Sequence, residues 1–292
     1  MGKLYVGAVT VLILTFCVSC KKDQPAPSYI YIPSISVDSQ YGVSGSSSSK
    51  VTNVKVFNNT TLIGVYELPI QVPILSEGPT TIRCIAGIQN YGITSNIADY
   101  VFYEPSEDPI TLERNSTDTI RPVVRYNPSS TADYWWEDFD GAGHAFAEGD
   151  TSNASLVITN TSSEVFEGNG SGKFDLDAED AYSKFFSEEE FVYNPSQAAY
   201  VEMDYRNNQN FFFALILRSN AGLVQKLPIF QFSPTDIIDG EPQWNKIYIE
   251  IGSFLNQTNG LASYDICFDV PRDVSVTNPI VMLDNVKVIQ RK

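Results

Sequence analysis

The sequence has few of the residues from which catalytic sites are usually built. Of its 292 residues only one is a histidine, His144, and it stands in a glycine-rich segment. A Ser–His–Asp triad or a histidine-rich metal centre therefore lacks its parts. There is no Gly-x-Ser-x-Gly motif, and Gly168–Lys173 is a poor phosphate loop because Phe174 stands where Ser or Thr belongs. We expect no enzymatic activity. A glycosidase is the alternative, since two carboxylates alone can serve it.

Basic residues are also scarce. The chain has 19 Lys and Arg against 35 Asp and Glu, which gives a formal net charge of −16 at pH 7. Because phosphate neutralisation requires Lys and Arg, we expect no binding to nucleic acid. Repulsion from anionic lipid headgroups also favours a body that stands away from a membrane surface.

Long apolar runs are lacking beyond the N-terminus. Leu4–Val18 is apolar and follows Lys3, but it is shorter than the ~20 residues that span a bilayer. This pattern predicts a signal peptide over residues 1–19. Charged residues and a Pro-rich polar segment follow, so residues 20–27 are expected to form a tether.

Val18-Ser19-Cys20 resembles the lipobox of bacterial lipoproteins, although Cys17 stands where that family usually has Leu or Val. The resemblance implies acyl chains such as palmitate on Cys20, and several chains together anchor firmly. Lys21 after the cysteine fits the family's outer-membrane members, and the charged run there favours the cell surface. An ordinary signal peptide cleaved nearby is the alternative.

The remaining chain predicts an all-β protein. Runs of β-branched and aromatic residues recur between Gly, Pro, Asn and Ser clusters, as in short antiparallel strands and turns. Residues 28–127 predict a small sandwich of the immunoglobulin or prealbumin type, and 131–292 a jelly-roll sandwich. Ser44–Ser49 is expected to be a flexible loop, and Ala178–Glu190 a short surface helix. The expected strands are 28–37, 51–57, 62–66, 80–85, 99–103, 156–160, 172–176, 199–205, 211–217, 228–232, 244–251, 263–268 and 281–289.

Two segments of the second unit resemble the opening and closing strands of carbohydrate-binding-module jelly rolls, a galactose-binding-like fold. They are Trp136–Gly141 and Leu283–Val288. The resemblance implies that Asp140 and Asp284 help to hold a structural calcium ion, the one cofactor suggested for this chain. Solvated or turn-capping carboxylates are the other interpretation.

Glycan sites use exposed aromatic platforms, for which Trp135, Trp136 and Trp244 are the candidates. The alternative is that these rings fill the sandwich interior. Cys84 and Cys267 lie in apolar strand-like stretches, and are expected to be buried free thiols or, alternatively, an inter-domain disulfide.

Three functions remain. We predict a lipid-anchored, surface-exposed, non-catalytic scaffold subunit that docks on an outer-membrane β-barrel or other membrane-complex proteins in assembly, secretion or uptake. The alternative is a glycan-binding surface lipoprotein that uses its jelly roll. The third is the two-carboxylate glycosidase. Because one fold hosts many functions, the choice among these three depends on the residues of the site and not on the fold.

Overall fold

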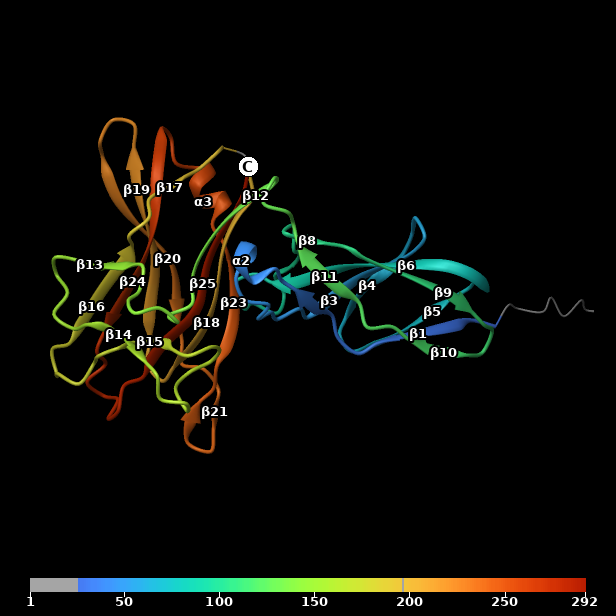
Figure 1. Ribbon diagram of the computed structural model, residues 1–292, viewed down its shortest axis with the longest axis horizontal. Helices are drawn as coiled ribbons and strands as arrows, with labels where there is room; N and C mark the ends of the chain where they lie inside the picture. The colour runs from blue at the N-terminus through green and yellow to red at the C-terminus, as the bar shows by residue number, and fades with distance from the viewer. Residues whose placement is uncertain (1–25, 196) are drawn as a thin grey trace, which may run out of the picture.

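The structure is a computed structural model that describes residues 26–195 and 197–292. In this part the chain forms two β-sandwiches side by side (Figure 1). The all-β prediction, with an immunoglobulin-like sandwich before a jelly roll, is confirmed. The predicted signal peptide, Cys20 and most of the tether lie outside the described residues. Neither α2 (Tyr41–Ser44) nor α3 (Gly252–Asn256), the helices of the described part, is long and apolar enough to cross a membrane.

The N-terminal sandwich has two layers. One contains the sheets β10-β1-β5 and β2-β11-β8, each of which includes one parallel pair, β1 with β10 and β2 with β11. The other contains β4-β3-β6-β7 with β9 beside β6. Alternate residues of both layers, such as Ile30 and Val56, point into one core. The strands are β1 (Ser28–Ile32), β2 (Ser36–Asp38), β3 (Asn53–Asn58), β4 (Thr61–Glu67), β5 (Ile70–Ile74), β6 (Gly78–Gln89), β7 (Ile97–Asp99), β8 (Tyr103–Glu104), β9 (Ser106–Leu112), β10 (Thr117–Thr119) and β11 (Val123–Tyr126).

The jelly roll also has two layers, which we name by position. The junction sheet is β14-β15-β25-β18-β23 with β12, and the distal sheet is β13-β16-β24-β19-β20 with β17. Their inward residues form a second core. The strands are β12 (Ala132–Glu137), β13 (Phe146–Glu148), β14 (Leu156–Thr159), β15 (Ser171–Phe174), β16 (Tyr182–Ser187), β17 (Phe191–Val192), β18 (Ala199–Asn207), β19 (Phe211–Ser219), β20 (Val224–Phe232), β21 (Ile237–Ile238), β22 (Glu241–Pro242), β23 (Asn245–Glu250), β24 (Leu261–Pro271) and β25 (Val281–Arg291).

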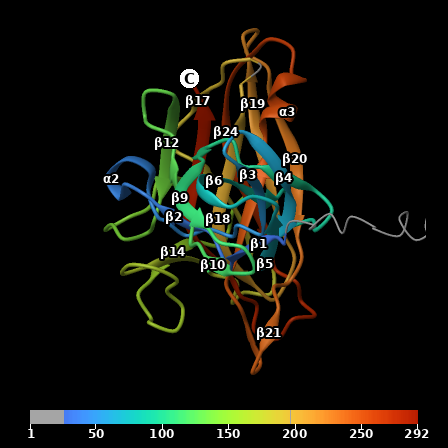
Figure 2. The ribbon, with the colours of Figure 1, turned by 90° about the vertical axis from the view of Figure 1, so that its right-hand side faces the viewer.

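Only the junction sheet is covered by the N-terminal sandwich. Tyr200, Tyr248 and Ile289 of that sheet belong to the core of the N-terminal sandwich, so the two units pack through an apolar contact. Seen from that side, β3, β4 and β6 lie in front of β18 (Figure 2). The outward face of the distal sheet is therefore the face that points away from the N-terminal sandwich.

Two local expectations are wrong. Ala178–Glu190 contains strand β16 instead of a surface helix, because Phe185 points into the jelly-roll core while Tyr182 and Lys184 face outward. The helix was predicted because the alanines and phenylalanines of this segment recur at a spacing typical of an amphipathic helix. The Gly/Ser stretch Ser44–Ser49 is not simply a flexible loop, since Ser44 and Ser46 are buried between the two sandwiches.

Candidate functional site

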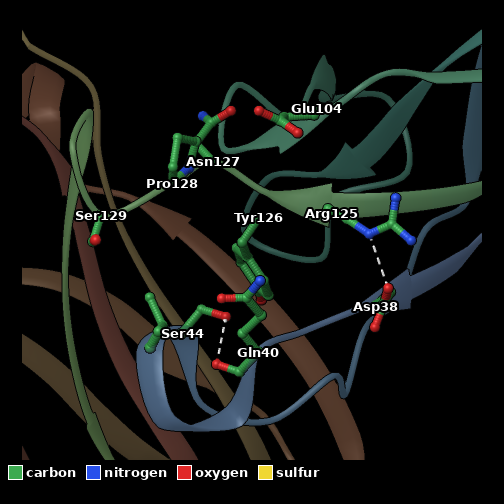
Figure 3. A pocket seen from close by; sticks show the side chains of 10 residues that line it. Asp38, Gln40, Ser44, Glu104, Arg125, Tyr126, Asn127, Pro128 and Ser129 are labelled. Atoms are coloured by element: carbon green, nitrogen blue, oxygen red, sulfur yellow. Dashed lines mark hydrogen bonds and ion pairs between the residues drawn. The ribbon is translucent and has the colours of Figure 1, made fainter.

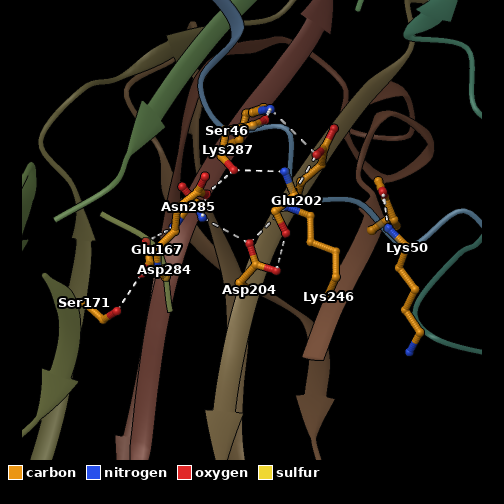
Figure 4. Close-up of polar contacts among 12 residues, drawn as sticks. Ser46, Lys50, Glu167, Ser171, Glu202, Asp204, Lys246, Asp284, Asn285 and Lys287 are labelled. Carbon is orange, nitrogen blue, oxygen red and sulfur yellow. Dashed lines mark hydrogen bonds and ion pairs between the residues drawn. The ribbon is translucent and has the colours of Figure 1, made fainter. Parts of the chain in front are cut away.

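A buried carboxylate lies at the centre of the contact between the two sandwiches (Figure 4). Glu202 of β18 is fully buried. Its Oε2 accepts a 2.8 Å hydrogen bond from the Tyr126 hydroxyl, and its Oε1 accepts one from Tyr100. The Nζ atoms of Lys246 and Lys287 lie 3.7 and 3.9 Å from Oε2. Two cations thus balance the charge of Glu202, and two tyrosine hydroxyls from the N-terminal unit hold its carboxylate in place.

Burial shifts the proton affinity of the groups around Glu202. Burial lowers the pKa of Lys287 to about 8, against the raising effect of Glu202. Its Nζ lies 3.9 Å from the centre of the Tyr126 ring and donates to the Ser46 carbonyl at 3.3 Å. Burial also raises the pKa of Tyr126 well above its usual value, with the Glu202 carboxylate acting in the same direction. These phenols remain protonated donors at neutral pH.

Two serines of the N-terminal unit, the buried Ser46 and the partly buried Ser48, complete this network. Ser48 Oγ donates to Asp204 Oδ1 at 2.8 Å, and Ser46 Oγ donates to Glu167. Asn285 Nδ2 donates to Glu167 at 2.9 Å and to Asp204 at 3.3 Å. Every charged group of the junction therefore has a partner within the protein, which favours a structural role for it.

A small hollow of about 260 Å³ lies beside the junction (Figure 3). Asp38 and Arg125 at its rim form a 2.9 Å ion pair, and Ser44 binds the Gln40 carbonyl. The Tyr126 hydroxyl, also in its wall, is committed to Glu202. Since these polar groups already bind each other, little is left in this hollow to recognise a ligand.

A larger hollow of about 920 Å³ lies beside β14 and β15. Its wall is mainly polar, and Lys173 pairs with Glu164 there at 2.7 Å. Phe174, the one aromatic residue of the wall, is buried in the jelly-roll core. This hollow has volume but no exposed ring to grip an apolar ligand face.

The distal sheet presents a different surface, which we call the distal face. It consists of the side chains that four adjacent strands direct to the outer side of the sheet, where strand alternation places every second residue. The four strands are β16, β24, β19 and β20. The residues of the distal face are Tyr182, Lys184, Phe186, Phe212, Ala214, Ile216, Arg218, Val224, Lys226, Pro228, Asp265, Cys267 and Asp269.

Small residues form the floor of the distal face. Ala214 and Cys267 are paired across β19 and β24, and both are buried. On either side of this pair in the same row stand Phe186 of β16 and Pro228 of β20. A row with two small side chains between two larger ones leaves a depression in the middle of the sheet.

The Lys226 side chain crosses this floor. Lys226 starts from β20 opposite Ile216, and its Nζ forms an ion pair with Asp269 of β24, so it reaches diagonally across β19. Asp269 also accepts a 2.7 Å hydrogen bond from the Tyr182 hydroxyl. Burial raises the pKa of Tyr182, and its hydrogen bond to Asp269 does the same. The carboxylate is therefore held by a cation on one oxygen and a phenol on the other.

Lys226 divides the distal face into two hollows. One, of about 310 Å³, is largely apolar and has Tyr182 and Phe212 in its wall. The other, of about 230 Å³, has Phe186 and Arg218 in its wall. Lys226 belongs to both, so the hollows adjoin one another. Phe212 is 36% exposed, which leaves part of its ring free for a ligand.

Arg218 and Asp265 form the charged pair of the smaller hollow. Arg218 Nη2 lies 2.6 Å from Asp265 Oδ2, and its Nε lies 3.7 Å from Glu190. The hydrogen bond to Asp265 raises the pKa of Arg218 further. Burial raises the pKa of Asp265, and the bond to Arg218 opposes that shift. Both side chains are thus held in place before any ligand arrives.

The three predicted tryptophans do not form a common platform. Trp135 packs edge-on against Phe146 and Phe191, on the jelly-roll core. The Trp136 ring lies against Gly45 of the N-terminal unit. Trp244 contacts Phe166 and lines a separate hollow of about 280 Å³ with Tyr91 and Phe230.

Asp140 and Asp284 both meet the segment 167–171. Asp140 Oδ1 accepts the backbone N–H groups of Asn169 and Gly170, and Asp284 Oδ2 accepts the Ser171 hydroxyl at 2.5 Å. Within residues 26–195 and 197–292, no three Cys, His, Asp or Glu side chains converge as metal ligands. The donors present here do not by themselves form a calcium site, and calcium stays a prediction.

Cys84 and Cys267 are free and buried. Burial raises the pKa of each thiol to about 12. Of the two expectations for these residues, the free thiols are found and the inter-domain disulfide is not.

The distal face is not predictable from the sequence directly, because its residues come from four strands spread along 182–269. One signal was available in β24. Asp265, Cys267 and Asp269 alternate with the apolar Ile266 and Phe268, so the two sets point to opposite faces of the sheet. What the alternation does not tell is which residues of β16, β19 and β20 stand beside them.

No protein-family model matches the chain, and none of the curated proteins matches it. Solved structures that are similar include the CBM22-1 xylan-binding domain of Paenibacillus barcinonensis Xyn10C, at 11% identity over 54% of this chain and 94% of that one, with a TM-score of 0.38. The C-terminal family 22 carbohydrate-binding module of Clostridium thermocellum Xyn10B has 11% identity, 53% and 91% coverage and a TM-score of 0.36. A CBM29-2 variant in complex with mannohexaose has 11% identity, 54% and 92% coverage and a TM-score of 0.34. At such identities and TM-scores, these similarities do not indicate what the present chain binds.

Proposed function

We propose that the protein binds a glycan on the distal face. One observation carries the proposal: half-exposed aromatic rings stand around a floor of small residues that an oriented Lys226–Asp269 pair crosses. The alternative function predicted from the sequence, a glycan-binding surface protein, thus has a site with the required chemistry. The residues of this site are not the tryptophans, Trp135, Trp136 and Trp244, that were expected to bind the glycan.

The chemistry of a sugar matches this face in two ways. A pyranose ring has an apolar C–H side, which packs on an aromatic ring such as Phe212. Its hydroxyl groups both donate and accept hydrogen bonds, and so fit the carboxylate of Asp269 beside the ammonium of Lys226. Because Asp269 is already held by Tyr182, little side-chain freedom is lost on binding.

The shape of the face favours a chain over a small enclosed ligand. The two hollows adjoin at Lys226 and lie on a sheet whose outward side is uncovered by the N-terminal sandwich. A site built on strands also keeps its side chains in a defined geometry. An oligosaccharide lying across the strands would contact both hollows at once.

The scaffold role in an outer-membrane complex stays a prediction. Partner sites are marked by contiguous exposed apolar patches. The most exposed large apolar side chains of the described residues lie in different places: Leu75 follows β5, Leu223 is in the β19–β20 turn, and Val274 follows β24. These three side chains do not form one apolar patch for a docked protein.

The lipid anchor is part of the proposal. Cys20 lies outside the described residues, and its lipidation is inferred from Val18-Ser19-Cys20 alone. The described chain begins at the end of the N-terminal sandwich that is farther from the jelly roll (Figure 1). An anchor there would leave the distal face pointing away from the membrane. If Cys20→Ala remains membrane-bound and acylated, the anchor is wrong.

Binding to an array of neutral and charged oligosaccharides and polysaccharides tests the glycan proposal. We expect the purified protein to bind at least one glycan class and Phe212→Ala to lose about tenfold or more in affinity, the equivalent of about 1.4 kcal/mol. Tyr31→Ala is the matched control, because Tyr31 is 38% exposed on β1 of the other sandwich. Absence of all glycan binding would overturn the proposal. Equal losses in both variants would move the site away from the distal face.

A further inference from the structure

The smaller hollow of the distal face is rich in cations. Lys184, Arg218 and Lys226 line it, against one carboxylate, Asp265. The chain as a whole has nearly twice as many acidic residues as basic ones. Asp265 and Glu190 pair with Arg218, and Asp269 pairs with Lys226, so the positive charge of this hollow left without a carboxylate partner among the described residues is that of Lys184.

Two of these cations keep donors to spare. Asp269 lies directly opposite Lys184 in the strand register, but its oxygens bind Tyr182 and Lys226 and not Lys184. Within the described ranges, no carboxylate forms an ion pair with Lys184. Arg218 uses Nη2 and Nε on Asp265 and Glu190.

The remaining amino group of Arg218, Nη1, is buried and has no hydrogen-bond partner among the residues described. A buried donor without an acceptor is unfavourable, and a ligand oxygen would relieve it. An anionic oxygen would do so best, because charge-assisted hydrogen bonds are the stronger ones. Lys184 lines the same hollow and adds a positive charge to its wall.

The larger hollow is lined mainly by apolar and aromatic residues. Tyr182, Phe212 and Pro228 line it, and its one cation, Lys226, is paired with Asp269. A neutral sugar ring suits this end of the face, and an anionic group suits the other. Because the two hollows differ in this way, a ligand that contacts both of them can bind in one orientation only.

We infer that the distal face selects glycans that carry an anionic substituent, a carboxylate or a sulfate, and seats that substituent between Lys184 and Arg218. This inference rests on the proposed glycan-binding function and names its ligand class. Phe212 holds a neighbouring sugar ring, and the Lys184–Arg218 end reads the charge.

The test uses matched glycans that differ in charge alone. Polygalacturonate is compared with its methyl ester and dextran sulfate with dextran, and a broad array supplies further acidic and neutral pairs. The wild-type protein should bind the anionic member of a pair more tightly, and added NaCl should weaken that preference. The two polymer pairs also show whether the group is a carboxylate or a sulfate.

The variants are Lys184→Gln and, as a control of equal charge change, Lys292→Gln. Lys292 lies at the chain end and pairs with Asp133, away from the distal face. Lys184→Gln should lose about tenfold in affinity for the anionic glycan and little for its neutral partner, while Lys292→Gln keeps both.

The outcomes separate the two claims. Binding of neutral glycans with equal or greater affinity overturns the anionic preference and leaves glycan binding intact. A Lys184→Gln variant that loses neutral and anionic ligands equally also overturns it. If no glycan of either kind binds, the proposed function itself fails.

Discussion

The ammonium of Lys226 reaches the carboxylate of Asp269 across the width of strand β19. The contact is possible because Ala214, between them on β19, is too small to block it. The pair separates a cationic hollow from an aromatic one and orients a carboxylate that Tyr182 also binds. The Lys226–Asp269 pair thus stabilises the sheet and, in the proposed function, also contacts the ligand.

Removing the Lys226 side chain should therefore affect binding far more than folding. Lys226→Ala is expected to lower glycan affinity about tenfold. The free energy of unfolding should change by only about 0–1 kcal/mol, because Lys226 is partly exposed and the buried Asp269 keeps its hydrogen bond from Tyr182. Calorimetric titration and urea unfolding measure the two quantities. A loss of several kcal/mol in stability with unchanged binding would make the pair structural only.

The buried Glu202 should contribute strongly to stability. Glu202→Ala leaves Lys287 buried without its carboxylate, which we expect to cost about 3–5 kcal/mol. Tyr126→Phe removes one hydrogen bond to that carboxylate and should cost about 1.5–3 kcal/mol. Urea unfolding measures both, with Glu188→Ala on the exposed surface as the control. If Glu202→Ala is as mild as the control, the junction is not held by this charge.

Stability should depend on pH through Asp284. Burial raises the pKa of Asp284 to about 7 from its ordinary 3.8, against the hydrogen bonds that favour its charged form. The folded state thus holds this proton more tightly, so the contribution of Asp284 to stability is full below about pH 4 and is lost as the pH rises towards about 7. Asp284→Asn lacks this titration. The stability difference between variant and wild type should shift in favour of Asn between pH 4 and 7, and a constant difference would contradict the shift.

The two buried thiols should be slow to react. Because burial raises the pKa of both to about 12, very little thiolate exists at pH 7.5. We expect alkylation of Cys84 and Cys267 in the folded protein to be at least ~100-fold slower than in urea, as followed by peptide mass spectrometry. Cys267 lies on the floor near Lys226, so Lys226→Ala should speed its labelling, with Cys84 as the internal control. Rapid labelling of both in the native wild type would contradict their burial.

Regular alternation made much of the fold predictable. Phe211–Leu217 is predicted as a strand because its unbroken apolar run has strand length, and Trp244–Ile251 because its apolar and polar residues alternate; β19 and β23 lie there. The N-terminal unit was harder, because β10 is short and polar, β11 has only four residues, and the two strands depend on pairing with β1 and β2. Their sequence alone does not distinguish them from loops.

The sites depended on contacts between distant segments. Glu202 reads as a polar position in a strand, yet it is buried because Tyr100 and Tyr126 arrive from the other sandwich. Likewise, Lys226 and Asp269 are 43 residues apart, and only the strand order brings them together. The residue types indicate which functional groups the chain contains, but only the strand order determines which of them lie together.

The most direct test of the central claim is a crystal structure of the protein with a glycan that binds it. Our account predicts a sugar ring packed on Phe212, within about 4 Å, and polar substituents bonded near Lys226 and Asp269. A glycan seated elsewhere, for example beside Trp244 and Tyr91, would contradict the claim that the distal face is the binding site.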